Sequence, residues 1–83
     1  MAGSPITEQY RALREALAHA RRSRGVTQTD LSRRLAKPQS YVSKLERGER
    51  RIDLIEVFEI AEALEVDPLA LIASVHAQWV TLR

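Results

Sequence analysis

Residues 26–50 read VTQTDLSRRLAKPQSYVSKLERGER, a stretch with signals for two short helices and a turn between them. It opens with a helix start, because the hydroxyl of Thr27 can cap a helix whose third residue is Asp30. Aspartate near a helix N-terminus is also favoured by the helix dipole. We therefore expect one helix to run from this cap to about Ala36, where a turn must follow before the next element begins.

The second part of the stretch places polar and basic side chains around two apolar residues, Val42 and Leu45. Pro38 can begin a helix here and Gly48 can end it. A helix over about 38–47 spans roughly 14 Å at 1.5 Å per residue. Because so short a helix is not stable alone, packing of Pro38, Val42 and Leu45 must hold it against the rest of the chain.

The outward side of this second helix is almost wholly hydrogen-bonding. At 100° per residue, Ser40, Ser43, Lys44 and Arg47 point away from the apolar side, and Gln39 lies beside them in the first turn. The helix therefore offers donors and acceptors to a partner and gives little surface to the core.

The remaining sequence predicts an all-α, five-helix fold. Its three glycines and three prolines fall between apolar-periodic segments, and no alternating strand pattern extends over more than a few residues. We expect one compact domain over residues 1–83, since 83 residues leave no room for a second core. The three other helices are expected from about Pro5 or Thr7 to Gly25, from the Asp53 and Glu56 capping box to about Glu65, and from Asp67 and Pro68 over about 68–83.

Charge is divided along the chain although the formal net charge is only +2. Residues 1–51 carry twelve Lys or Arg against five Asp or Glu, whereas residues 52–83 carry one against six. The basic half suggests a polyanion-binding face, although a solvated charged surface explains the composition slightly better. No segment is apolar enough for a signal peptide or a membrane span, so we expect a cytoplasmic protein without membrane contact.

Several linked motifs resemble one known family. They are R..RG.TQ..L at the entry to the second helix, L...L......VSKLE.G.R across the turn, and I.EAL.VDPLAL towards the end. From Leu13 to about Ile72, or about three-quarters of the chain, the sequence resembles the lambda-repressor-like helix-turn-helix domains of the Xre/Cro family. This resemblance implies a helix-turn-helix motif over about 28–47, with its second helix in the major groove of double-stranded DNA, as in a bacterial or phage transcription regulator.

The resemblance also assigns roles in DNA binding. Gln39, Ser40 and Lys44 stand where the family reads bases, and Ser43 lies near them. Glutamine suits adenine and lysine suits guanine, which agrees with these roles. Backbone contacts are implied or expected from Gln28, Lys37, Tyr41, Arg47, Arg50 and Arg51, although Tyr41 serves equally well as a cover for the core edge.

The turn of the motif departs from the family. Ala36, Lys37 and Pro38 occupy the place of the family's glycine, small apolar residue and hydroxyl cap. Without the glycine, we expect the turn to find a conformation that alanine tolerates. The missing hydroxyl cap is expected to cost roughly 1 kcal/mol, partly offset by proline's fixed φ.

The last two predicted helices carry more apolar residues than one buried face requires. Related proteins often pair through their C-terminal helices, so the resemblance supports a homodimer on two half-sites. An alternative of equal weight is that Trp79 closes the core of a single chain near the first helix. The expected interface residues are Phe58, Ile60, Ile72, Val75, His76 and Trp79.

An enzyme is not expected. The sequence has no cysteine and no Gly-rich phosphate loop, and its two histidines lack metal-ligand spacing, so we expect no catalytic residue, metal, cofactor or small-molecule ligand. Glu46 is expected to fix the end of its own helix through local hydrogen bonds. The competing function is a protein-interaction module, such as an antitoxin or accessory regulator, in which DNA binding is secondary.

Overall fold

The computed structural model describes residues 5–82, with side chains for residues 8–81, and these residues form five helices without a strand. The prediction of an all-α fold with five helices is confirmed. The helices are α1 (Pro5–Ser23), α2 (Gln28–Arg34), α3 (Tyr41–Glu46), α4 (Leu54–Leu64) and α5 (Pro68–Leu82).

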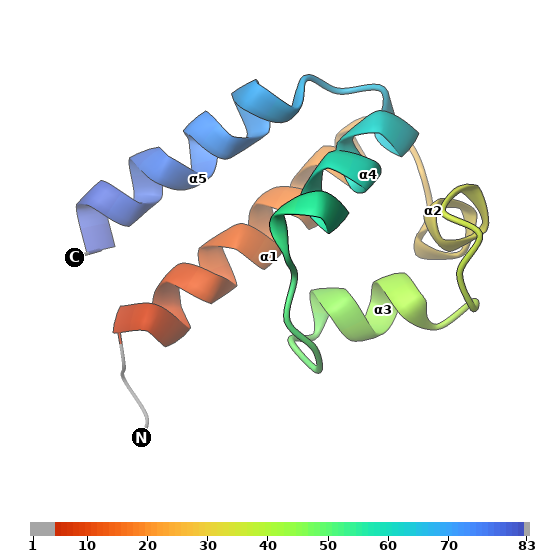
Figure 1. The fold of residues 1–83 in the computed structure, drawn as a ribbon, viewed down its shortest axis with the longest axis horizontal. Helices are drawn as coiled ribbons and strands as arrows, with labels where there is room; N and C mark the ends of the chain where they lie inside the picture. The colour runs from red at the N-terminus through yellow and green to blue at the C-terminus, as the bar shows by residue number, and fades with distance from the viewer. Residues whose placement is uncertain (1–4, 83) are drawn as a thin grey trace.

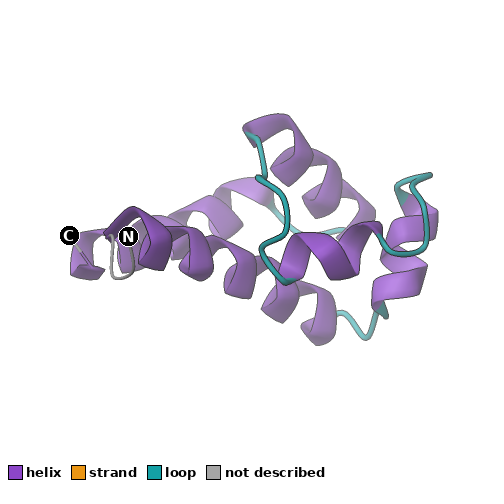
Figure 2. Cartoon of the chain, turned by 90° about the horizontal axis from the view of Figure 1, so that it is seen from below, coloured by secondary structure: helices purple, strands orange, loops and turns teal. Residues whose placement is uncertain are grey.

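Helix α1 is the centre of the arrangement. α5 runs back alongside it, so that the N-terminal end of α1 and the C-terminal end of α5 lie at the same side of the molecule (Figure 1). The shorter helices α2 and α3 lie towards the other end, and α4 packs against α1, α2 and α5. Figure 2 shows the two long helices extending together past the shorter ones.

The predicted helix starts of α2, α4 and α5 are present. The Thr27 hydroxyl accepts the N–H of Asp30 at 3.0 Å, and Asp53 and Glu56 form both halves of a capping box. Pro68 is the first residue of α5, and the preceding aspartate accepts the N–H of Leu69 at 2.9 Å. The capping residues were therefore identified correctly.

The predicted helix over 38–47 is shorter in the structure. Ser40 is its N-cap and Tyr41 its first residue, after a turn in which the Tyr41 N–H donates to the carbonyl of Pro38. Pro38 is exposed and is not part of the core, so that prediction is wrong. The buried side chains of α3 are Val42 and Leu45, each 1% exposed, and they hold this helix against the core.

Four helices end in the same way. In each, one residue takes a left-handed conformation, its N–H bonds to a carbonyl three residues back, and the next N–H reaches back five residues, which is the Schellman motif. Two of the left-handed residues are glycines and two are not: Gly25 (φ 70°), Ala36 (φ 56°), Gly48 (φ 81°) and Glu65 (φ 58°). Ala36 thus keeps the left-handed conformation that glycine adopts more readily, so the turn has not changed to a conformation that suits alanine better.

The core lies where α1, α2, α3 and α4 meet. On α4 the buried residues are Val57, Ile60, Ala61 and Leu64, whereas Leu54 and Phe58 are exposed. On α5 it is Leu71 that is buried, and Leu69 is 71% exposed. Ile6 and Leu82 lie outside the described side chains.

Candidate nucleic-acid interface

The four residues expected to read bases lie on the outer surface of α3 and of the turn before it. Gln39 and Ser40 are exposed in that turn, and Lys44 is exposed on α3. Ser43 is half-buried, and its hydroxyl donates to the Ser40 carbonyl at 3.0 Å. Lys44 has no hydrogen-bond or ion-pair partner among the residues that the structure describes. Its ammonium group is therefore available to a ligand.

A shallow polar hollow joins this surface to the start of α2. It is lined by Gln28 and Thr29 from α2 and by Gln39, Ser40 and Ser43 from the α3 side. The structure thus brings together three of the four base-reading candidates and one backbone candidate, Gln28. Thr29 was missed in the sequence, although its place one residue beyond Gln28 could have indicated it.

The C-terminal end of α3 is held by a buried charge. Glu46 accepts hydrogen bonds from Arg21 Nε at 2.8 Å and Nη2 at 3.2 Å, and from Gln28 Nε2 at 2.7 Å. The side chains of Arg21 and Glu46 are only 10% and 11% exposed. The expectation of local hydrogen bonds at Glu46 is wrong, because its partners lie on α1 and α2.

The N-terminal end of α3 is capped from another helix. Ser40 makes no side-chain cap, but the hydroxyl of Ser32 on α2 accepts the N–H of Val42 at 3.1 Å. Ser32 is completely buried. The cap that the turn sequence lacks is therefore supplied across the helix-turn-helix motif, and it also fixes α2 against α3.

Tyr41 is the centre of a cluster of charged side chains. The Lys37 ammonium and the Arg50 guanidinium lie 5.5 Å and 5.0 Å from its ring centroid. Its hydroxyl donates to Glu56 Oε2 at 2.9 Å and accepts from Arg50 Nη1 at 3.1 Å. Burial and the hydrogen bond to Glu56 raise the pKa of Tyr41 above its ordinary value. Three expected backbone-binding residues, Lys37, Tyr41 and Arg50, therefore form one group.

The other expected backbone-binding arginines lie apart from this cluster. Arg47 is exposed and donates to Glu49 at 2.7 Å, and this hydrogen bond raises the pKa of the arginine. The Arg51 guanidinium lies 5.7 Å from the ring centroid of Tyr10 on α1. Two further arginines near the motif also have partners, since Arg33 pairs with Asp30 and Arg34 donates to the Ala63 carbonyl.

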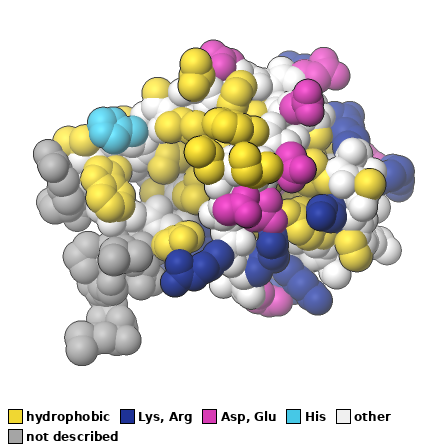
Figure 3. Space-filling view, in the orientation of Figure 1, with side chains coloured by type: hydrophobic (Ala, Val, Ile, Leu, Met, Phe, Trp, Pro, Cys, Tyr) yellow, Lys and Arg dark blue, Asp and Glu magenta, His cyan; other side chains and the backbone are white. Residues whose placement is uncertain are grey.

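Apolar side chains gather on a second surface, over α4 and α5 (Figure 3). Acidic side chains border it on one side, and basic ones lie beyond them. Trp79 is 45% exposed and Phe58 39% exposed, so a single chain does not bury either of them. Ile60, in contrast, is only 2% exposed and belongs to the core, so it is not accessible to a second chain. The exposed large hydrophobic residues are Leu54, Ile55, Phe58, Leu69, Trp79 and Val80.

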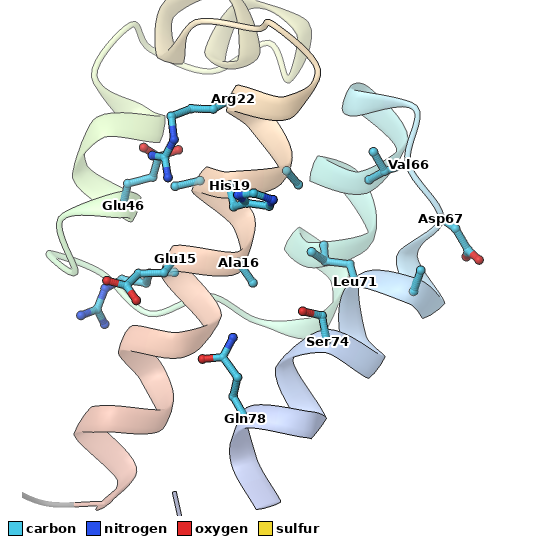
Figure 4. Close-up of a pocket in the computed structure, with 14 residues that line it drawn as sticks. Glu15, Ala16, His19, Arg22, Glu46, Val66, Asp67, Leu71, Ser74 and Gln78 are labelled. Atoms are coloured by element: carbon cyan, nitrogen blue, oxygen red, sulfur yellow. The ribbon is translucent and has the colours of Figure 1, made fainter. Parts of the chain in front are cut away.

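A hollow of about 750 Å³ lies between α1 and α5 rather than beside α3 (Figure 4). Small side chains such as Ala16 leave it open, and His19, Ser74 and Gln78 are among the polar residues around it. Within residues 8–81 no group of His, Asp and Glu is arranged to hold a metal ion. None of the described helices is long and apolar enough to cross a membrane.

The fold and the polar surface of α3 together define a helix-turn-helix protein. Residues 17–71 match the family model described as helix-turn-helix. The chain is 40% identical over 55 residues to the uncharacterized HTH-type transcriptional regulator y4dJ of Sinorhizobium fredii (strain NBRC 101917 / NGR234), covering 66% of this chain and 71% of that protein. It is also similar to the solved structure of an XRE-family like protein from Pseudomonas syringae pv. tomato str. DC3000, with a TM-score of 0.82, 41% identity, and coverage of 88% and 89% of the two chains.

The chain therefore belongs to the helix-turn-helix family, in its Xre-like group. This family is a class of DNA-binding transcription regulators and not of enzymes. The resemblance drawn from the sequence motifs is confirmed.

Proposed function

We propose that this protein is a sequence-specific transcription regulator that binds operator half-sites in double-stranded DNA as a homodimer. In this proposal α3 enters the major groove, and Gln39, Ser40, Ser43 and Lys44 reach base edges. Gln28, Lys37, Tyr41, Arg47, Arg50 and Arg51 contact the phosphate backbone. A DNA-binding regulator of this kind would act in the cytoplasm.

The observation that carries the proposal is the exposed polar face of α3 around Lys44, whose ammonium has no partner among the described residues. Beside it, the hollow lined by Gln28 and Gln39 offers amide donors and acceptors, and no large apolar side chain lines it. A protein-docking surface would be expected to carry aromatic and aliphatic residues at its centre. Polar groups that read base edges, with cations at the border, suit a DNA groove better.

The test begins with selection of bound duplexes from a random pool, followed by affinity measurements on the selected sequence. Lys44→Ala should reduce discrimination between bases at one position by about 1–3 kcal/mol. Arg50→Ala should weaken binding to all sequences by a similar factor and make it less dependent on salt. If the wild-type chain selects no sequence and binds no duplex in a salt-dependent manner, the proposed function is wrong.

For the homodimer, we propose an interface centred on Trp79, with Phe58, Ile72, Val75 and His76. Its support is the apolar surface over α4 and α5, which one chain leaves open. Near it, an apolar hollow of about 270 Å³ is lined in part by Leu54, Ile72 and Val75. A symmetric interface would use the same patch twice and would set two copies of α3 on half-sites about 34 Å apart.

Sedimentation over a concentration series tests the dimer. Trp79→Ala should weaken dimerisation by at least about tenfold, because large aromatic residues at the centre of an interface contribute most to its free energy. His19→Ala, which changes an exposed residue of α1, should leave dimerisation unchanged. A wild-type chain that stays monomeric at high concentration contradicts the homodimer, and the same apolar surface would then favour a different protein partner, as in an antitoxin.

A further inference from the structure

Glu56 is an acidic residue inside the proposed DNA-binding surface. Its two carboxylate oxygens bind different groups. Oε1 accepts the N–H of Asp53 at 3.0 Å and caps α4, while Oε2 lies 2.7 Å from Arg50 Nη2 and 2.9 Å from the Tyr41 hydroxyl. The side chain of Glu56 is 15% exposed. One carboxylate thus joins the start of α4 to the start of α3 and to the loop between them.

We propose that Glu56 is a positioning residue for DNA binding, which orients Arg50, directly and through the Tyr41 hydroxyl, so that the guanidinium meets one phosphate of the DNA backbone. The proposal rests on the proposed function and extends it to a residue that touches no DNA. Glu56 makes the Tyr41 hydroxyl and the Arg50 guanidinium converge, and Arg50 retains N–H groups that do not face the carboxylate.

Two effects of Glu56 on DNA affinity oppose each other. The negative charge of Glu56 repels the phosphates and partly neutralises Arg50, the cation proposed to attract them. Against this, Arg50 is 40% exposed, and without its carboxylate partner the flexible side chain would have to be ordered when DNA binds. The repulsion is reduced because the Glu56 carboxylate is already compensated by its donors Arg50, Tyr41 and the Asp53 N–H, whereas the ordering of Arg50 by Glu56 is lost completely when the carboxylate is removed. We therefore expect positioning to have the larger effect.

The hydrogen bonds around Glu56 also leave a spectroscopic signature. Burial opposes its ionisation, but the donors from Asp53, Arg50 and Tyr41 outweigh burial and lower the pKa of Glu56. In turn, burial and the bond to Glu56 raise the pKa of Tyr41. Tyrosine absorbance at alkaline pH can therefore report whether this contact exists in solution without any DNA present.

The test is Glu56→Gln in the full chain. A glutamine at this position can still accept the Asp53 N–H, so the capping box is retained, but its amide cannot accept from both Tyr41 and Arg50. The matched control is Glu62→Gln, an exposed residue of the same helix, which removes the same charge. Affinity for the selected duplex is measured for all three proteins at one salt concentration, and thermal unfolding confirms that each is folded.

We expect Glu56→Gln to weaken binding by about three- to tenfold although it makes the protein more positive, and Glu62→Gln to change it by less than about twofold. Binding that is unchanged or tighter in Glu56→Gln overturns the proposal and leaves the DNA-binding function intact. If the wild-type chain binds no duplex, both fail together. The Tyr41 titration should move to lower pH in Glu56→Gln, and an unmoved titration also contradicts the positioning role.

Discussion

The two ends of α3 are held by different chemistry. At its C-terminal end, Glu46 has a side chain only 11% exposed and is bonded to Arg21 on α1 and Gln28 on α2. At its N-terminal end, a single neutral hydrogen bond joins Ser32 to the backbone of Val42. The adjoining Tyr41 cluster is half-exposed.

This difference separates stability from binding along one short helix. Breaking a buried ion pair leaves an uncompensated charge and is costly, whereas an exposed pair contributes little. The Glu46 end therefore fixes α3 in the fold, and the Tyr41 end keeps cations at the surface, where the proposed phosphate contacts lie. Variants at each end test whether the two roles are separate.

The largest effect is expected at the buried end. Glu46→Leu should lower the free energy of unfolding by about 3–5 kcal/mol, because the Arg21 charge stays buried without its partner. The double variant Arg21→Met with Glu46→Leu should recover a large part of this loss, since no charge then remains to be compensated. Urea unfolding followed by circular dichroism measures both. If Glu46→Leu lowers the free energy of unfolding by less than about 1 kcal/mol, the ion pair at the C-terminal end of α3 behaves like an exposed one and does not fix the helix.

A smaller effect is expected at the N-terminal end of α3, where the bond from Ser32 is neutral. Ser32→Ala removes the acceptor of the buried Val42 N–H and should cost about 1–3 kcal/mol in the same unfolding measurement. Ser43→Ala is the matched control, because its half-buried hydroxyl donates to the Ser40 carbonyl at the surface, and a change within about 0.5 kcal/mol is expected. Equal losses in the two serine variants would contradict a special role for the cap from α2.

The features that the sequence predicted correctly are local ones. The Thr27 cap, the Asp53 and Glu56 capping box and Pro68 at the start of α5 each depend on residues within a few positions of one another. The polar surface of α3 was also predictable, since helical geometry and residue type suffice to place Lys44 outward.

The bonds that hold α3 were not predictable, because they join residues far apart in the chain. Arg21 and Glu46 are separated by 25 positions, and Ser32 and Val42 by 10. Ile60 was misplaced for a related reason: α4 packs against three helices, so its buried face is broader than one stripe and turned relative to it. Only the packing of helices on one another determines such contacts.

The smallest effect, and the only stabilising one, is expected in the turn that leads to α3. Ala36 has φ 56°, which glycine adopts more readily, and its side chain is exposed, so Ala36→Gly should raise the free energy of unfolding by about 0.5–1 kcal/mol. Ala73→Gly, at an exposed position inside α5, should lower it by about the same amount, because there the alanine favours the helix. Opposite signs in the two variants would show that the turn holds strain. If Ala36→Gly instead destabilises the protein, the rigidity that alanine gives the turn contributes more to the stability of the folded state than the strain at Ala36 costs.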